Sequence, residues 1–390
     1  MSSPPLNRRY EAGVGERPQT CFASLEADAS PPSDPIVVTP AASPGHTSFP
    51  DPAPWPVPDA VPPASRMLAH APAGSAVRAP LLILDLESRG GDVPHTIITF
   101  GNVGGRLRSA PFWASEHHRI AHLARGQAVE VAGTIGSWRD RRQLHVESIR
   151  VLPPGQVPWN ELLPSCGDPA PWWRLLDGWR TTIRGPRLSR TLALLFDDEA
   201  FRARFERCPA SPNGHHARLG GLLQHTCEVA HLALAAARLA PTADRDLLLA
   251  GALLHDIGKI ESYRWDGLFD TTIAGRALGH VVLGSLLLDR AVHNAHYPTC
   301  TRDELELLHH LILSHHGKLE FGSPVLPLTL EAEILCHADL ASARGASMDE
   351  ALNDPELFPG GSPVSIRPLW QLDQRRVWRG RSDWGCSPQA

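Results

Sequence analysis

The spacing of hydrophobic and polar residues divides the chain into two kinds of segment. Between residues 78 and 153, short apolar and β-branched runs alternate with glycines, which is typical of strands joined by tight turns. The pattern predicts strands over 81–86, 95–100, 106–113, 127–134 and 143–151, with a single helix over 114–124. Five strands and one helix indicate a small β-barrel of the OB type.

From residue 201 to 345 the apolar positions recur every three to four residues, which predicts an all-α domain. Asp244 stands where a helix N-cap is expected, Gly258 where a helix would end, and Thr301 to Glu304 has the form of a capping box. A proline-rich connection with amphipathic helices, 154–200, precedes this domain. The predicted helices are 172–183, 186–196, 219–239, 244–258, 276–295, 301–316 and 329–343.

Two flanking segments lack periodicity. Residues 1–77 are rich in proline, serine and alanine and predict a disordered arm, whose Pro-x-Pro repeats around 52–58 are of the kind that docks a protein partner. Residues 346–390 combine proline, glycine, tryptophan and arginine and predict a loosely structured tail. We therefore expect a multidomain α+β protein, in which the barrel is followed by a helical bundle.

Composition narrows the setting. The net charge of −5 gives no global nucleic-acid signature, so any basic patch must be local. No run of about 18 apolar residues predicts a membrane span, and the start of the chain lacks the apolar region of a secretion signal, so we expect a cytoplasmic protein without a membrane partner. Seven scattered cysteines without a Cys-x-x-Cys pair fit neither a disulfide framework nor a zinc ribbon.

The candidate chemistry centres on His255 and Asp256, which interrupt a buried helix made almost entirely of leucine and alanine. A buried aspartate costs several kcal/mol unless it is paired or bound to a metal. Helices of a bundle can aim side chains into one interior site, and imidazoles with carboxylates suit transition metals. The candidate ligands on five predicted helices are His225, His255, Asp256, His280, His315, His316 and Asp339.

These ligands are too many for one ion with an open position, so we assign two. His225, His255, Asp256 and Asp339 would hold the first ion. His280 would hold the second together with one or both of His315 and His316, and Asp256 would bridge the pair. Taken singly, each histidine is more often an ordinary core or surface residue than a ligand, so the prediction depends on the whole set.

The chain contains only two lysines, Lys259 and Lys318, among 37 basic residues. Each follows a histidine motif, HDIGK and SHHGK. This shared setting favours a compact ammonium where a flat guanidinium would not serve, with contact to a substrate phosphate as the functional interpretation. The alternative is a cation that complements a helix C-terminus.

The predicted barrel carries a local excess of positive charge, ten arginines against seven acidic residues. Aromatic residues interleaved with arginines are expected of a groove that stacks bases and follows phosphates. The alternative is that the aromatics fill the barrel and the arginines form its solvated face. The candidate contacts are Arg106, Arg108, Phe112, Trp113, Trp138, Arg139, Arg141 and Arg142.

The order of these motifs resembles the HD phosphohydrolase superfamily, and within it the YhaM-like 3′-to-5′ exoribonucleases, which join an OB-fold to an HD domain. The similar stretches include PNGHHARLGGLLQHT (212–226), LLLAGALLHDIGKI (247–260), GRALGHVVLG (275–284), SHHGKLEFGSP (314–324) and LEAEILCHADLASA (330–343). The resemblance implies the metal-ligand role for the seven candidates, and a phosphate-side role for Lys259 and Lys318 beside the catalytic Asp256. One departure is Ser342, where the family usually has a carboxylate, and this puts support of the last helix in doubt.

The leading hypothesis is a metal-dependent phosphodiesterase that degrades single-stranded RNA, and also DNA as an extension, from the 3′ end to nucleoside 5′-monophosphates. Two divalent ions are expected, Mn²⁺ or Fe²⁺ first, with Co²⁺, Zn²⁺ and Ni²⁺ as alternatives. The same chemistry would serve an HD nucleotide or cyclic-nucleotide phosphohydrolase. A third hypothesis is a non-catalytic single-strand-binding protein in plasmid or conjugative DNA handling, and the sequence leaves a homo-oligomer open.

Overall fold

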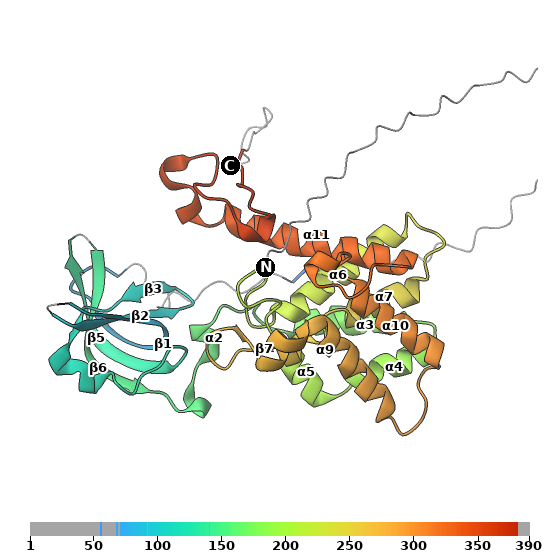
Figure 1. Cartoon of the computed structure of the whole chain (residues 1–390), viewed down its shortest axis with the longest axis horizontal. Helices are drawn as coiled ribbons and strands as arrows, with labels where there is room; N and C mark the ends of the chain where they lie inside the picture. Colours follow the sequence, from blue (N-terminus) through green and yellow to red (C-terminus); the bar gives the residue numbers. More distant parts are fainter. Residues whose placement is uncertain (1–54, 57–67, 69–70, 92, 140, 381–390) are drawn as a thin grey trace, which may run out of the picture. The chain divides into compact units, whose positions relative to one another are not determined.

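The structure is a computed structural model that describes residues 55–56, 68, 71–91, 93–139 and 141–380. An antiparallel sheet precedes a bundle of helices along the chain (Figure 1). Most of the arm expected over 1–77, and the last ten residues of the expected tail, lie outside the described residues. No helix in the described ranges is long and apolar enough to cross a membrane.

The sheet is antiparallel and has the strand order β3-β2-β1-β5-β6, with β4 paired to β2. Its core faces follow the alternation of the sequence, because Val129, Val131 and Ile135 of β5 point inward and are fully buried. The strands are β1 (Ala76–Arg89), β2 (His95–Asn102), β3 (Gly105–Arg108), β4 (Phe112–Trp113), β5 (Ala128–Trp138) and β6 (Arg141–Val151).

The OB-type barrel expected from the sequence is not closed in this structure. Strands β3 and β6 are the two edges of a linear order, and one isolated bridge between Ser109 and Leu144 joins them among the described residues. The expected strand 106–113 is interrupted by Ser109, Ala110 and Pro111, and proline lacks the amide hydrogen that a ladder requires. A continuous ladder therefore does not close the sheet.

The expected helix over 114–124 is also shorter than predicted. Only Ala114–Arg119 is helical, as the 3-10 helix η2. After η2, the segment buries only Ile120 and Leu123 in the sheet core. Two buried side chains are too few for the regular apolar stripe that would hold a longer helix against the sheet.

The helical region has a core of its own, to which α6 and α7 contribute most of their length. Both helices are apolar nearly all round, as expected of helices surrounded by others. The helices are α2 (Trp159–Leu162), α3 (Ala170–Arg180), α4 (Pro186–Phe196), α5 (Glu199–Phe205), α6 (Gly221–Ala237), α7 (Arg245–Leu254), α8 (Lys259–Ser262), α9 (Ile273–His293), α10 (Arg302–Ser314) and α11 (Leu330–Leu352).

Short elements connect the helices. A two-stranded ribbon follows α8, and single 3-10 turns mark the connections and the C-terminal region. These elements are β7 (Tyr263–Arg264), β8 (Asp270–Thr271), η3 (Pro154–Gln156), η4 (Leu319–Phe321), η5 (Pro355–Leu357), η6 (Pro359–Gly361) and η7 (Trp370–Leu372).

Two helix starts confirm the predicted caps. The Asp244 side chain accepts hydrogen bonds from the amides of Asp246 and Leu247, at 2.9 and 3.0 Å. Thr301 and Glu304 form the predicted capping box at the start of α10.

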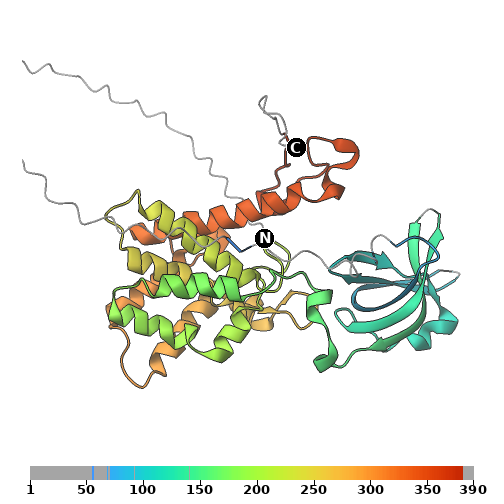
Figure 2. The same cartoon turned by 180° about the vertical axis from the view of Figure 1, so that it is seen from behind.

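The C-terminal region differs from the expected loose tail. Helix α11 continues to Leu352, and in both views its last turns extend beyond the other helices and lead into the C-terminal segment (Figures 1 and 2). A small apolar cluster follows, because several side chains separated in sequence bury one another. Its buried members are Ala351, Leu357, Phe358, Leu369, Leu372 and Val377.

Candidate metal centre and groove

The seven predicted ligands come from three helices, α6, α9 and α11, and from the turns that follow two others, α7 and α10. His225 lies within α6, and Asp339 lies within α11. His255 and His315 each follow the last residue of a helix, α7 and α10, so their rings lie at helix ends that face the interior. His225, His255, Asp256 and His315 are almost completely buried.

Two glycines set the backbone around Asp256. Gly258 was expected to end the helix, but its φ of −68° is ordinary, and α7 already ends at Leu254. Its role is close packing, because a Cβ atom at 258 would lie 2.3 Å from the amide nitrogen of Gly284 in α9. Gly279 has a φ of +75°, which kinks α9 directly before His280.

One carboxylate oxygen of Asp256 faces the first group of predicted ligands. Its Oδ2 lies 3.4 Å from Nε2 of His225 and 3.2 Å from Nε2 of His255. Nε2 of His225 is in turn 3.0 Å from Oδ1 of Asp339. These four residues, assigned to the first ion from the sequence, therefore lie together in the structure.

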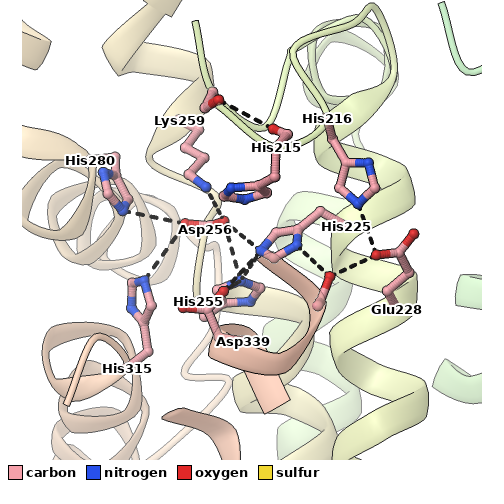
Figure 3. Close-up of polar contacts among 12 residues, drawn as sticks. His215, His216, His225, Glu228, His255, Asp256, Lys259, His280, His315 and Asp339 are labelled. Atoms are coloured by element: carbon pink, nitrogen blue, oxygen red, sulfur yellow. Dashed lines mark hydrogen bonds and ion pairs between the residues drawn. The ribbon is translucent and has the colours of Figure 1, made fainter. Parts of the chain in front are cut away.

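The other carboxylate oxygen faces the second group. Oδ1 of Asp256 lies 3.4 Å from Nε2 of His280 and 3.7 Å from Nε2 of His315. Nε2 of His316 is 3.2 Å from Nε2 of His280. Figure 3 shows His280 and His315 on one side of Asp256 and His225 on the other. Asp256 thus stands between two histidine groups, with one oxygen turned to each.

Hydrogen bonds at Nδ1 orient the rings. Nδ1 of His255 lies 2.8 Å from the carbonyl of Ala252, and Nδ1 of His315 lies 2.7 Å from that of Ile312. A carbonyl only accepts, so each Nδ1 carries the hydrogen and leaves the Nε2 lone pair directed into the site. The same holds for His316, whose Nδ1 lies 2.7 Å from the carbonyl of Phe321.

His225 is oriented by side chains instead. Its Nδ1 lies 2.9 Å from the hydroxyl of Ser342, and that hydroxyl donates to Oε2 of Glu228 at 2.7 Å. His216 lies 2.8 Å from the same carboxylate oxygen. Ser342, the position that put support of α11 in doubt, therefore passes a hydrogen bond from His225 to a carboxylate on α6.

Lys259 neutralises part of this buried charge. Its ammonium lies 2.5 Å from Oδ2 of Asp256. Burial raises the pKa of Asp256, but Lys259 and His255 outweigh burial and hold that pKa well below its usual range. Burial likewise opposes ionisation of Asp339, and its contact with His225 lowers its pKa nonetheless.

The histidines differ in their protonation. Burial disfavours a charge on His225, but hydrogen bonds to Asp256 and Asp339 raise its pKa to about 9. Burial lowers the pKa of His280 to about 3 and that of His315 well below its usual range. His280 and His315 therefore present neutral imidazoles, the form that binds metal ions.

The site also contains polar atoms whose hydrogen-bonding capacity is unmet. Within the described residues, Oδ1 of Asp256 and Nε2 of His315 are buried without a hydrogen-bond partner. Buried polar groups normally have a hydrogen-bond partner, so buried atoms without one point to a bound ion or water. Carboxylate oxygens and neutral imidazoles are a donor set that suits divalent transition metals, and the residues fit such ions.

The two lysines are separated by the structure. Lys259 is buried at the centre, whereas the Lys318 side chain is 63% exposed. The ammonium of Lys318 pairs with Glu320 at 3.6 Å and lies 5.2 Å from the centre of the Phe321 ring. Lys259 therefore lies beside Asp256, whereas Lys318 lies on the loop that follows His316.

Sequence reasoning missed three residues near the site. Glu228 and His216 support His225, and the ring of His215 lies 4.9 Å from that of His225. Burial lowers the pKa of His215 to about 2, so its imidazole is neutral. The signals were present, because Glu228 follows His225 by three positions on one helix face and the stretch 212–226 carries both other histidines.

A second concave feature lies on the sheet. It is a groove of 1020 Å³, and it contains seven of the eight predicted nucleic-acid contacts. Trp113 and Trp138 are exposed by 45% and 64%. Its aromatic, histidine and arginine residues are Arg89, His95, Arg108, Phe112, Trp113, Trp138, Arg139, Arg141, Arg142 and His145.

Two of the predicted contacts are placed differently from the rest. Phe112 is only 4% exposed and belongs to the sheet core, so its ring is not open for base stacking. It alternates with the exposed Trp113 because neighbouring strand residues face opposite sides. Arg106 is exposed on β3 but does not line the groove.

Comparison with known proteins finds one family model and several relatives. The family model "HD domain" matches residues 222–344. The 3′-5′ exoribonuclease YhaM of Bacillus subtilis is 32% identical over 277 residues, which cover 70% of this chain and 81% of the relative. That of Bacillus licheniformis is 32% identical over 306 residues, 77% of this chain and 88% of the relative. No solved structure matches.

Proposed function

The chain belongs to the family of YhaM 3′-5′ exoribonucleases, and we propose on this premise that it is a metal-dependent nuclease that shortens single-stranded RNA from its 3′ end. The products would be nucleoside 5′-monophosphates. The structural observation that carries the proposal is the position of Asp256, with Oδ2 toward His225 and His255 and Oδ1 toward His280 and His315.

The first ion would be held by His225, His255, Asp256 and Asp339, and the second by His280, His315 and His316 with Asp256 as the shared ligand. We propose Mn²⁺ or Fe²⁺, because a set of imidazole nitrogens and carboxylate oxygens suits both. When bound, two such ions supply Lewis acidity to the phosphoryl oxygens and to an attacking water.

The chain's own residues prepare the site for a polyanionic substrate. Hydrogen bonds at Nδ1 of His255 and His315 fix the rings, so little reorganisation is needed when a phosphate enters. Lys259 keeps a positive charge beside Asp256, since the carboxylate raises the pKa of this buried ammonium despite desolvation. Its position supports a contact between the ammonium and an oxygen of the scissile phosphate.

The sheet groove supports a polymeric substrate over a free nucleotide. Exposed Trp113 and Trp138 beside several arginines suit stacked bases with a phosphate backbone, as in nucleic-acid-binding OB-folds. We therefore propose an OB-like role for the sheet, in which it holds RNA upstream of the nucleotide being cleaved. The cytoplasm remains the predicted location.

Digestion of 5′-labelled single-stranded RNA tests the proposed function. With Mn²⁺, the label should stay on progressively shorter fragments while nucleoside 5′-monophosphates accumulate, and a chelator should stop both. A circular RNA of the same sequence has no 3′ end and should resist. Release of the labelled 5′ nucleotide first, or cleavage of the circular RNA at the same rate, would contradict attack from the 3′ end. A single-stranded DNA of the same sequence measures whether the enzyme prefers ribose or deoxyribose.

A further inference from the structure

The C-terminal segment 363–380 has a folded structure that its sequence did not suggest. Bridges between Val364 and Trp378, and between Leu369 and Arg375, bring its two halves together. Leu369, Leu372 and Val377 turn inward into the apolar cluster at the end of α11. We call this segment the C-terminal platform.

The platform exposes aromatic and basic side chains. Trp370 and Trp378 are exposed by 62% and 74%. The segment contains four arginines and one aspartate, within a chain whose net charge is −5. Arg367, Arg375 and Arg376 are exposed, so the positive charge lies on the same short segment as the two indoles.

Two contacts tie the platform to the elements of the metal centre. The Trp370 indole lies against Gly214, since a Cβ atom at 214 would be 3.8 Å from its ring, and Gly214 directly precedes His215. Arg344 donates to Asp373 at 2.6 Å, and Arg344 follows the ligand candidate Asp339 by five residues on α11. The platform is thus anchored to both segments that flank His225.

We infer that the C-terminal platform is a second binding surface for single-stranded RNA, separate from the sheet groove. The inference rests on the proposed function, because it places the polymer beside the site that would cleave it. Exposed indoles offer stacking faces to bases of any sequence, and arginines pair with phosphates. A basic surface complements a polyanion, which favours RNA over a neutral or basic protein partner, and the two exposed indoles favour a polyanion that carries stackable bases over an acidic protein.

The test compares variants of the full chain. Trp378→Ala removes an indole that is mostly exposed, and Arg375→Glu with Arg376→Glu reverses two charges. Arg302→Glu is the matched control, because Arg302 is an exposed arginine at the opposite end of α10 from His315, about 20 Å away along the helix.

Binding of a 20-nucleotide single-stranded RNA is measured by fluorescence anisotropy with chelator present, at several salt concentrations. Trp378→Ala should raise Kd about tenfold, and Trp378→Phe, which keeps a stacking face, should restore most of the affinity. The double arginine variant should lower the slope of log K against log salt by about 1.4. Hydrolysis of a dinucleotide with Mn²⁺ should stay unchanged in all variants.

The inference would be overturned if the platform variants had the same Kd and salt slope as Arg302→Glu. It would also be overturned if they lost as much dinucleotide hydrolysis as RNA binding. Binding is measured without hydrolysis, so the two proposals fail separately. A wild-type chain that binds RNA through the platform but does not shorten it would contradict the proposed function and support the platform.

Discussion

The hydroxyl oxygen of Ser342 on α11 lies 2.9 Å from Nδ1 of His225 on α6, although 117 positions separate them in the sequence. The same hydroxyl donates to Glu228 at 2.7 Å, so it accepts the hydrogen of His225 and passes its own to the carboxylate. These two hydrogen bonds fix which nitrogen of His225 faces Asp256 and Asp339. The orientation of a metal ligand thus depends on a small side chain from another helix.

Ser342→Ala should weaken metal binding at the first site by about 10- to 100-fold, because His225 loses its acceptor and Glu228 loses one of its donors. Metal affinity is measured by competition with a chelator, so the result does not depend on hydrolysis. The matched control is Ser347→Ala, another buried serine of α11, whose hydroxyl donates to Ala343 in the helix itself. Equal affinities in the two variants would show that Ser342 does not orient the ligand.

Local signals in the sequence predicted the helical region well. The bounds 186–196 of α4 agree with the structure, and the caps at Asp244 and Thr301 are confirmed, because each depends on residues within three positions. The predicted ligands lie on helices with regular apolar faces or directly after them. Because these apolar faces all pack into one core, the periodicity of the sequence directs the ligands toward it.

Features that depend on distant contacts could not be predicted in the same way. Glu228 lies three positions from His225 on α6, but it supports His225 through Ser342 on α11, and no local pattern connects Ser342 to either residue. Closure of the sheet depends on how β3 and β6 meet, which the strand pattern does not specify. The tail lacked periodicity because its small core is built from side chains of irregular spacing.

Lys259→Arg should lower kcat/KM more than tenfold, on the order of 1.4 kcal/mol or more of transition-state stabilisation. Lys259 is 5% exposed and its ammonium lies 2.5 Å from Asp256, so a wider guanidinium would displace its neighbours. Lys318→Arg is the comparison, because its side chain is exposed and should accept the change with a smaller loss. Unchanged rates in Lys259→Arg at full metal content would remove Lys259 from the proposed phosphate contact.

Trp138→Ala in the sheet groove should weaken binding of a 20-nucleotide RNA by about 1 to 3 kcal/mol and leave dinucleotide hydrolysis intact. A point variant is preferred to removal of the sheet, because Leu82 of β1 packs against Leu163 and Leu219 in a buried cluster. Val93→Ala, at a 60% exposed position next to β2, is the control. Equal affinity of the two variants for the RNA would show that RNA does not bind in the sheet groove.

Acid should remove the contribution of one ion pair to stability. Glu304 accepts hydrogen bonds from Arg187 and from the amide of Thr301, which lower its pKa from an ordinary 4.5 to about 2. A depressed folded-state pKa stabilises the fold above pH 4.5, and this contribution is lost as the pH falls toward 2. Its partial exposure limits the contribution to about 1 kcal/mol or less.

Glu304→Gln should therefore have a lower free energy of unfolding than the wild type at pH 7, and the difference should shrink as the pH falls from 4.5 to 2. Urea titrations at a series of pH values measure it. Glu306→Gln, on the same helix and in an exposed pair with Arg302, should change stability little throughout. A difference that is independent of pH would contradict the assignment to the Glu304 carboxylate.

If Asp256 joins two histidine groups into one site for two ions, the metal content of each folded chain must show both ions. After loading with Mn²⁺ under anaerobic conditions and dialysis, elemental analysis should find about two ions per wild-type chain. His280→Ala should keep about one, and Asp256→Asn should keep fewer than one, with fold checked by circular dichroism. One ion or none in the wild type, or two ions retained by folded Asp256→Asn, would contradict the account.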